Sequence, residues 1–214
     1  KMSGNEVWVT GFSDLKGEKY ASLISSANPD GVVDGSSGAT ALGDLATTVG
    51  QGLNSGLPIL DKFQDGAQFS MMHAFLGDIP GSIGETSSLL IIIGGLVLIA
   101  MGIGSWRIMG SMVIGGLVMG LIFNAFAVND FMALNPVHQI LLGGFMFGTV
   151  FMATDPVSAS QTNTGKIIYG FMAGFLGIMI RVFNPAYPEG IMMAILFMNA
   201  MAPLIDHYVV GANE

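Results

Sequence analysis

No cysteine occurs anywhere in the 214 residues of the chain. This absence excludes disulfide bonds, thiolate catalysis, and iron–sulfur or zinc sites built from cysteine within these residues. Any electron carrier bound to this chain must therefore be an organic molecule or be held by other ligands.

Charged residues are also scarce. They make up 10% of the chain, whereas hydrophobic residues make up 51%. Soluble domains carry roughly 25% charged residues, so the composition indicates an integral membrane protein surrounded by lipid. The net charge of −8 argues against nucleic acid as a partner, because that partner needs a basic surface. The 31 glycines are typical of transmembrane helices that pack closely, and the 16 methionines are interpreted as flexible apolar packing.

The hydrophobic residues are unevenly distributed. Residues 1–86 are polar and rich in Gly, Ser and Asp, whereas residues 87–214 contain hydrophobic runs close to the roughly 20 residues that cross a bilayer. The five runs are 87–104, 107–128, 136–153, 165–183 and 189–210. We therefore predict an all-α integral membrane protein with about five transmembrane helices and some broken or re-entrant segments. The last helix is expected to be kinked or broken at Pro203.

Basic residues give an orientation. Arg107 lies between the first two predicted helices and Lys166 between the third and fourth, so alternating helices place both on one side. The positive-inside rule makes this side cytoplasmic. Arg181 lies at the other end of its predicted helix and argues against this orientation. On this orientation the polar segment 1–86 meets the membrane from outside.

A short apolar run, 69–76, precedes a Gly- and Ser-rich stretch, 76–87. One interpretation is a surface loop in which Thr86 or Ser87 caps the first transmembrane helix. The other is a re-entrant half-helix, which is tolerated at membrane depth only when it is buried in protein or faces a cavity. His73 lies on the apolar run and is interpreted as a hydrogen-bonded packing residue, because no second histidine at metal-ligand spacing accompanies it.

A seven-residue stretch, 34–40, ends on a hydroxyl. It reads Asp34-Gly-Ser-Ser37-Gly38-Ala39-Thr40. One interpretation is a Gly-rich turn that leads into a helix. The other interpretation is a phosphate-binding turn with the same geometry, because free backbone N–H groups beside small residues can donate hydrogen bonds to a phosphate at close range. Thr40 would then be a covalent attachment point.

Two carboxylates interrupt apolar runs next to a proline. Asp155 precedes Pro156, and Asp206 follows Pro203 by three residues. Each is either a carboxylate at the water interface or part of a hard-oxygen sodium site beside unwound backbone. The predicted alternation of helices brings Asp155 and Asp206 to the same side, the cytoplasmic one.

The stretch 34–40 resembles the acceptor signature of flavin transferases, which esterify the phosphate of FMN to its final Thr or Ser. Three long segments, 151–160, 179–190 and 194–207, resemble the B-subunit family of the sodium-translocating NADH:ubiquinone oxidoreductases. A near relative is the D subunit of RNF ferredoxin:NAD oxidoreductases, which shares the flavinylated threonine and the Thr-Asp-Pro segment. The segment 184–190, Asn-Pro-Ala-Tyr-Pro-Glu-Gly, looks like the quinone-reductase member.

The resemblance implies that Thr40 carries FMN as a phosphoester, with Asp34, Ser37, Gly38 and Ala39 around it. It also implies electron transfer from NADH toward ubiquinone, coupled to Na+ translocation in a bacterial inner membrane, with Thr40 toward the periplasm. The expected partners are other subunits, one of them carrying a second flavin. A non-covalent riboflavin belongs to the family as well, but no residue is assigned to it. Asp155 and Asp206 match family carboxylates that are connected with sodium uptake.

Family members have about twice as many membrane helices and a basic C-terminal tail. We therefore expect this chain to be the second half of a longer polypeptide, in which residues 1–86 attach FMN and 87–214 form a five-helix region. A different class, a solute channel or secondary transporter, accounts for the broken helices but not for the flavin signature. No catalytic residue and no metal site are predicted.

Overall fold

A computed structural model describes Leu42 and residues 63–64, 69–79, 84–128, 130–184 and 190–211. Every regular element in these residues is a helix, as the sequence predicted. The candidate FMN-attachment segment, 34–40, lies outside the described residues. So does most of the segment 184–190.

Within the described residues, three helices are long and apolar enough to cross a membrane: α6 (Trp106–Ala125), α10 (Asn163–Phe183) and α11 (Ile191–Gly211). The first hydrophobic run forms α5 (Ser88–Ala100), whose 13 residues extend about 20 Å, against a hydrocarbon thickness of about 30 Å. The third run is interrupted. The expected count of five transmembrane helices is therefore not confirmed, although all five hydrophobic runs are helical.

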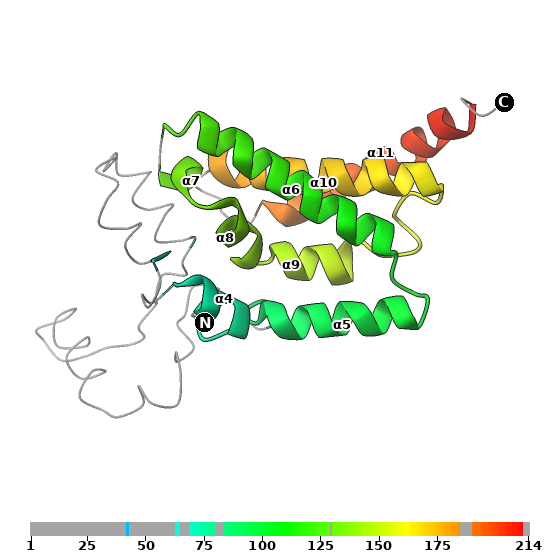
Figure 1. The fold of residues 1–214 in the computed structure, drawn as a ribbon. Coiled ribbons are helices and arrows are strands. Elements are labelled where there is room, and N and C mark those ends of the chain that lie inside the picture. Colours follow the sequence, from blue (N-terminus) through cyan, green and yellow to red (C-terminus); the bar gives the residue numbers. More distant parts are fainter. Residues whose placement is uncertain are drawn as a thin grey trace, which may run out of the picture.

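Helices α6 and α10 run in the same direction and lie side by side (Figure 1). Glycines allow this approach. A methyl group on Gly115 would lie 2.1 Å from the carbonyl oxygen of Phe171, and one on Gly174 would lie 1.9 Å from that of Met112. Both distances are far below van der Waals contact, so backbone packs directly on backbone, as is common between transmembrane helices.

Helix α11 runs antiparallel to α10. Tyr169 donates its hydroxyl proton to the amide oxygen of Asn199, with the two oxygens 2.5 Å apart. The helix continues through Pro203 to Gly211, so it is not broken at this proline, and the kinked alternative stays a prediction. The red end of α11 extends beyond the other helices (Figure 1).

The break falls instead in the third hydrophobic run. Helix α8 (Pro136–Leu141) ends at Leu142, and the chain resumes as the short helix α9 (Phe145–Phe147) and the π-helical turn η2 (Gly148–Met152). Leu142 is extended, with φ −91° and ψ 144°. Gly143 has a φ of 65°, a left-handed conformation that favours glycine. The four-residue helix α7 (Asp130–Ala133) precedes α8.

The short apolar run 69–76 forms α4 (Met71–Leu76), which is six residues long. It ends at Gly77 with a φ of 97°, and α5 begins after Ser87, whose hydroxyl accepts from the Leu90 amide. Ser87 is therefore the cap of the first long helix, one of the two residues predicted for that role. A methyl group on Gly77 would lie 2.7 Å from Cβ of Ser87, so the end of α4 lies close to the beginning of α5.

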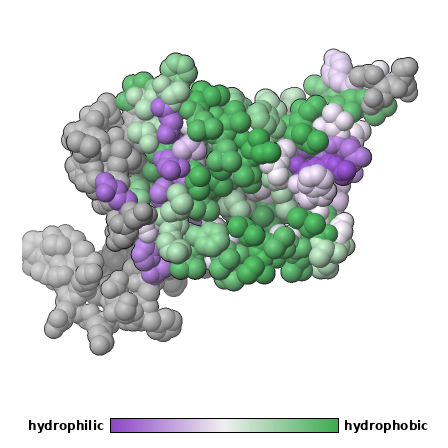
Figure 2. All heavy atoms as spheres, viewed as in Figure 1, coloured by the Kyte–Doolittle hydropathy of each residue, from purple (hydrophilic) through white to green (hydrophobic). Residues whose placement is uncertain are grey.

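Hydrophobic side chains cover the outside of the helices, and hydrophilic ones gather toward the two ends (Figure 2). The exposed apolar residues include Leu90, Leu96, Ile114, Leu121, Leu196 and Phe197. A soluble surface rarely carries so extensive an apolar face, whereas lipid accepts it. The described helices are therefore those of a multi-pass membrane protein.

Candidate functional site: two charged groups held by interrupted backbone

Asp206 on α11 reaches the start of α10. Its carboxylate accepts from the hydroxyls of Ser160 and Thr162, at 2.5 and 2.6 Å, and from the amides of Gln161 and Thr162, at 2.7 and 3.1 Å. The first amides of a helix have no partner within it, and a negative charge there is favourable. Asp206 thus ties α11 to the beginning of α10.

Gly165 makes room for this carboxylate. A methyl group at this position would lie 2.6 Å from Oδ1 of Asp206, 2.2 Å from Oγ of Ser160 and 2.4 Å from Oγ1 of Thr162. Thr162 also accepts from the Gly165 amide, at 3.1 Å. Any larger residue at 165 would displace the group of oxygens.

Asp155 lies in the turn that joins η2 to α10. It accepts from the amide of Val157, at 3.3 Å, and from both the amide and the hydroxyl of Ser158, at 3.2 and 2.7 Å. The Ser158 hydroxyl, followed by the Val157 amide, holds the pKa of Asp155 below its ordinary value. The side chain is partly exposed, as expected for a carboxylate at the water interface.

The predicted approach of Asp155 and Asp206 to one side is therefore observed, since both lie at the end where α10 begins. They do not share a ligand set among the described contacts: each is held by its own N–H and O–H donors. These N–H and O–H donors direct their hydrogens at the carboxylate oxygens that would otherwise be ligands for a cation. In this arrangement each carboxylate is a hydrogen-bond acceptor, so sodium uptake at either would require these bonds to open.

Arg181, unlike the two carboxylates, is a fully buried charged residue. Its side chain is 0% exposed. From α10 it donates to the carbonyl oxygen of Gln139 and to that of Leu142, the latter at 3.3 Å. Both carbonyls belong to the interruption after α8. Because Arg181 lies inside the protein, it is no loop charge, and its weight against the predicted orientation disappears.

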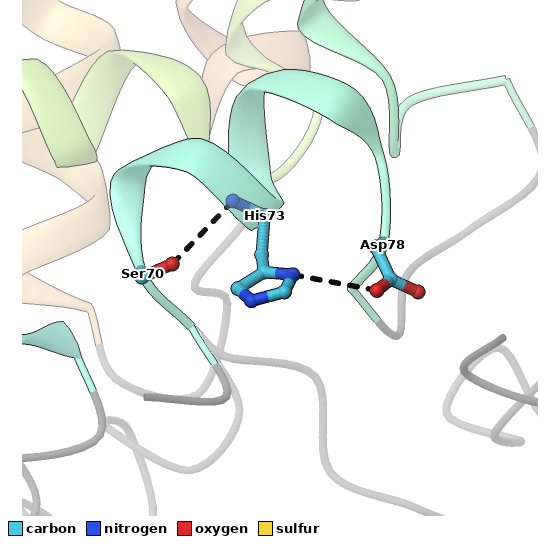
Figure 3. A network of polar contacts seen from close by, with 3 residues as sticks. All are labelled: Ser70, His73 and Asp78. Carbon is cyan, nitrogen blue, oxygen red and sulfur yellow. Dashed lines mark hydrogen bonds and ion pairs between the residues drawn. The ribbon is translucent and has the colours of Figure 1, made fainter. Parts of the chain in front are cut away.

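His73 forms a surface contact. Its Nδ1 lies 3.3 Å from Oδ2 of Asp78, while its amide donates to Ser70 at 3.5 Å (Figure 3). The side chains of His73 and Asp78 are 41% and 54% exposed, so the pair contributes little to stability. No group of three metal-ligating side chains occurs in the described part of the chain.

The Asp206 donors and the Arg181 contacts were not predicted. Thr162 and Asp206 are 44 residues apart, and no local pattern links them. The interruption after α8 had a visible signal, because Gly143 and Gly144 stand together inside a hydrophobic run.

Comparisons with known proteins agree with the fold and with the earlier resemblance. The profile of the NQR2, RnfD, RnfE family matches residues 1–213. The B subunit of the Na(+)-translocating NADH-quinone reductase of Azotobacter vinelandii is 49% identical over 91% of this chain and 46% of its own length. The protein of the same name from Chromohalobacter salexigens is 45% identical over 91% of this chain and 45% of its own. The protein of the same name from Stutzerimonas stutzeri is 47% identical over 85% of this chain and 43% of its own length.

The chain thus spans less than half the length of these curated relatives. The matched part includes the long helices, the turn with Asp155 and the end of α11 with Asp206. On the extent of the family match and the identity of these relatives, the chain belongs to the NQR2, RnfD, RnfE family.

Proposed function

We propose that this chain is part of the membrane subunit of a redox-driven sodium pump, an NADH:quinone oxidoreductase, in which Thr40 carries FMN as a phosphoester. The observation that carries the proposal is the 45–49% identity to proteins named as the B subunit of the Na(+)-translocating NADH-quinone reductase. The signature 34–40 in the same chain adds the attachment point. Other subunits, ubiquinone and Na+ are its proposed partners, and riboflavin its second proposed flavin.

FMN supplies the redox chemistry, and the protein supplies its position. A phosphoester at Thr40 is remote from the isoalloxazine ring, so the tether secures location and prevents loss of the flavin. The small residues Ser37, Gly38 and Ala39 would let the transferase close around the Thr40 hydroxyl, and Asp34 would orient it. The tether would therefore fix the position of the flavin in the electron-transfer chain, while the surroundings of the isoalloxazine ring would set its reduction potential.

The orientation follows from the helices. Arg107 begins α6 and Lys166 begins α10, and these helices run in the same direction, so both basic residues lie at one end. The positive-inside rule makes that end cytoplasmic, in a bacterial inner membrane. Residues 1–86 precede α5, which starts at the opposite end, and this supports the proposal that Thr40 lies on the periplasmic side.

Asp155 and Asp206 are the proposed sodium-uptake residues at the cytoplasmic end. Sodium uptake at Asp206 would require its hydrogen bonds to the Ser160 and Thr162 hydroxyls to open. Coupling requires that flavin reduction change the affinity of these oxygens for the ion, because a ligand bound equally by two states shifts neither.

An RNF-type ferredoxin:NAD oxidoreductase subunit is the second candidate, because the family profile includes RnfD. The names of the curated relatives favour the quinone reductase. The two candidates are distinguished by the electron donor that reduces the flavins of the assembled complex: NADH for the quinone reductase, and ferredoxin for the RNF-type complex.

The covalent attachment is tested in the complete polypeptide, produced together with its transferase. Denatured, washed protein is expected to retain flavin fluorescence. Thr40→Val is expected to abolish it, Thr40→Ser to keep it, and Thr47→Val, a nearby control, to leave it unchanged. Retained fluorescence in Thr40→Val would disprove the assignment.

Sodium uptake is tested by the sodium dependence of quinone reductase turnover. Asp206→Ala and Asp155→Ala are expected to weaken this dependence while leaving the covalent flavin content unchanged. An unchanged sodium dependence would return both carboxylates to a purely structural role at the membrane surface.

A further inference from the structure

Helix α11 has a buried side and an exposed side. Its buried residues recur at helical spacing and are Ile191, Ala194, Ile195, Met198 and Ala202. With them the helix packs against α10 and η2. On the far side Leu196 is 71% exposed, and Ala200 and Pro203 are exposed as well. These three residues follow one another at intervals of four and three, so they form one stripe along the helix, called here the Pro203 stripe.

Pro203 takes a hydrogen-bond donor away from the backbone of this stripe. Proline has no N–H, so the carbonyl oxygen of Asn199, four residues earlier, lacks the donor that an α-helix would give it. Asn199 lies eight residues after Ile191 in a helix that ends at Gly211. It is therefore about 12 Å from one end of the helix and about 18 Å from the other. This depth lies within a hydrocarbon core of about 30 Å, away from bulk water.

The side chain of Asn199 adds a second polar group at the same depth. Its Oδ1 accepts from the Tyr169 hydroxyl, at 2.5 Å, whereas no described residue accepts a hydrogen bond from its amide nitrogen. Lipid chains offer no hydrogen bond to a carbonyl oxygen or to an amide N–H, so exposing these groups to lipid is unfavourable. Beside a proline in a membrane helix, neighbouring helices supply such bonds. The Pro203 stripe therefore fits a protein neighbour better than it fits lipid.

The shape of the stripe and the length of related proteins indicate what this neighbour is. Ala200 is small and lies between Leu196 and Pro203, which allows a second helix to approach closely. The chain spans less than half the length of its curated relatives, so most of each relative lies outside the matched part. A helix from the remainder of the same polypeptide is the neighbour that these lengths favour.

We propose that the Pro203 stripe is the docking surface for a transmembrane helix from the remainder of the same polypeptide. That helix brings an O–H or N–H donor to the carbonyl oxygen of Asn199. The inference goes beyond the proposed function, because it rests on the membrane placement of α11 and not on the flavin or on sodium.

The test is photocrosslinking of the complete polypeptide in its assembled complex. Benzoylphenylalanine is introduced at Leu196, in the stripe, or at Leu121, the control, which is 60% exposed near the end of α6 at the same side of the bundle. After irradiation and digestion, crosslinked peptides are identified by mass. At Leu196 we expect a peptide of the same polypeptide from outside residues 1–214, in severalfold higher yield than at Leu121. Within one helical turn of the crosslinked residue, this peptide should carry a side chain with an O–H or N–H donor.

Equal yields at Leu196 and Leu121, or no protein crosslink at Leu196, would overturn the proposal, because lipid would then cover the stripe. A crosslink from Leu196 to a different subunit, or to a wholly apolar peptide, would overturn it as well. If benzoylphenylalanine at Leu196 prevents assembly, the same criteria apply at Met192, one turn away and 52% exposed. None of these outcomes involves Thr40 or sodium, so failure here is distinct from failure of the proposed function.

Discussion

Asp206 and Arg181 solve the same physical problem with opposite charges. At the start of α10, free amides are met by a carboxylate from α11. At the interruption after α8, free carbonyl oxygens are met by a guanidinium from α10. The surroundings differ, because Asp206 is only partly buried and Arg181 is 0% exposed.

This difference in burial decides how much each contact contributes to the stability of the folded protein. Water at the membrane surface competes for the hydrogen-bond donors around Asp206. When Asp206 is substituted, water therefore replaces part of the hydrogen bonding that the carboxylate provided. Arg181 is shielded from bulk solvent, so the hydrogen bonds that its guanidinium gives to the Gln139 and Leu142 carbonyl oxygens would not be readily replaced by bulk water. We therefore expect the buried contact of Arg181 to contribute more to stability than the partly exposed contact of Asp206.

The largest effect is expected from Arg181→Met, which keeps much of the side-chain volume and removes every donor. The Gln139 and Leu142 carbonyl oxygens then lose their bonds to the guanidinium, at about 1–3 kcal/mol each. Thermal unfolding of the complete polypeptide in detergent should show a large loss of stability. Arg107→Met, at a partly exposed position, is the matched control, and a loss no greater than the control's would remove the distinction between the two regions.

A smaller effect is expected from Gly165→Ala, which places a methyl group among the oxygens of Ser160, Thr162 and Asp206. Overpacking of this kind destabilises by about 1–3 kcal/mol. Gly110→Ala is the control, because a methyl group there meets nothing within 4 Å and should be neutral or stabilising by helix propensity. Equal thermal stability of the two alanine variants would show that the close approach at Gly165 is not real.

The smallest effect concerns Asp155 and pH. Its folded-state pKa is lowered from 3.8 by the Ser158 hydroxyl, so its contribution to stability is complete above the unfolded pKa and is lost as the pH falls through the lowered one. The difference in unfolding temperature between the parent and Asp155→Asn should stay constant from pH 7 to about pH 5 and shrink below about pH 4. A difference that grows on acidification would contradict the sign of this shift.

Composition and hydrophobic runs predicted the helical class, the positions of α6, α10 and α11, and the common side of Asp155 and Asp206. These features follow from segment length and polarity, which a sequence displays directly. The predicted break at Pro203 was wrong, because a proline in a sequence does not tell whether neighbouring helices support an uninterrupted helix through it; the alternative prediction of a kink stands.

The missed features depend on distant partners. Arg181 was interpreted as a charge at a helix end, because nothing in its own segment shows the carbonyl oxygens 39 and 42 residues away. Gly165 was unremarkable among 31 glycines until the carboxylate of Asp206 was placed beside it. Local patterns indicate elements, whereas the contacts between elements need the fold.

The central claim is that Thr40 carries FMN, and the most direct measurement is the intact mass of the peptide that spans Thr40, isolated from native membranes. The expected mass exceeds that of the bare peptide by FMN less one water, with fragmentation placing the increment on Thr40. A bare mass in fully assembled, active complex, or an increment on another residue, would contradict the account.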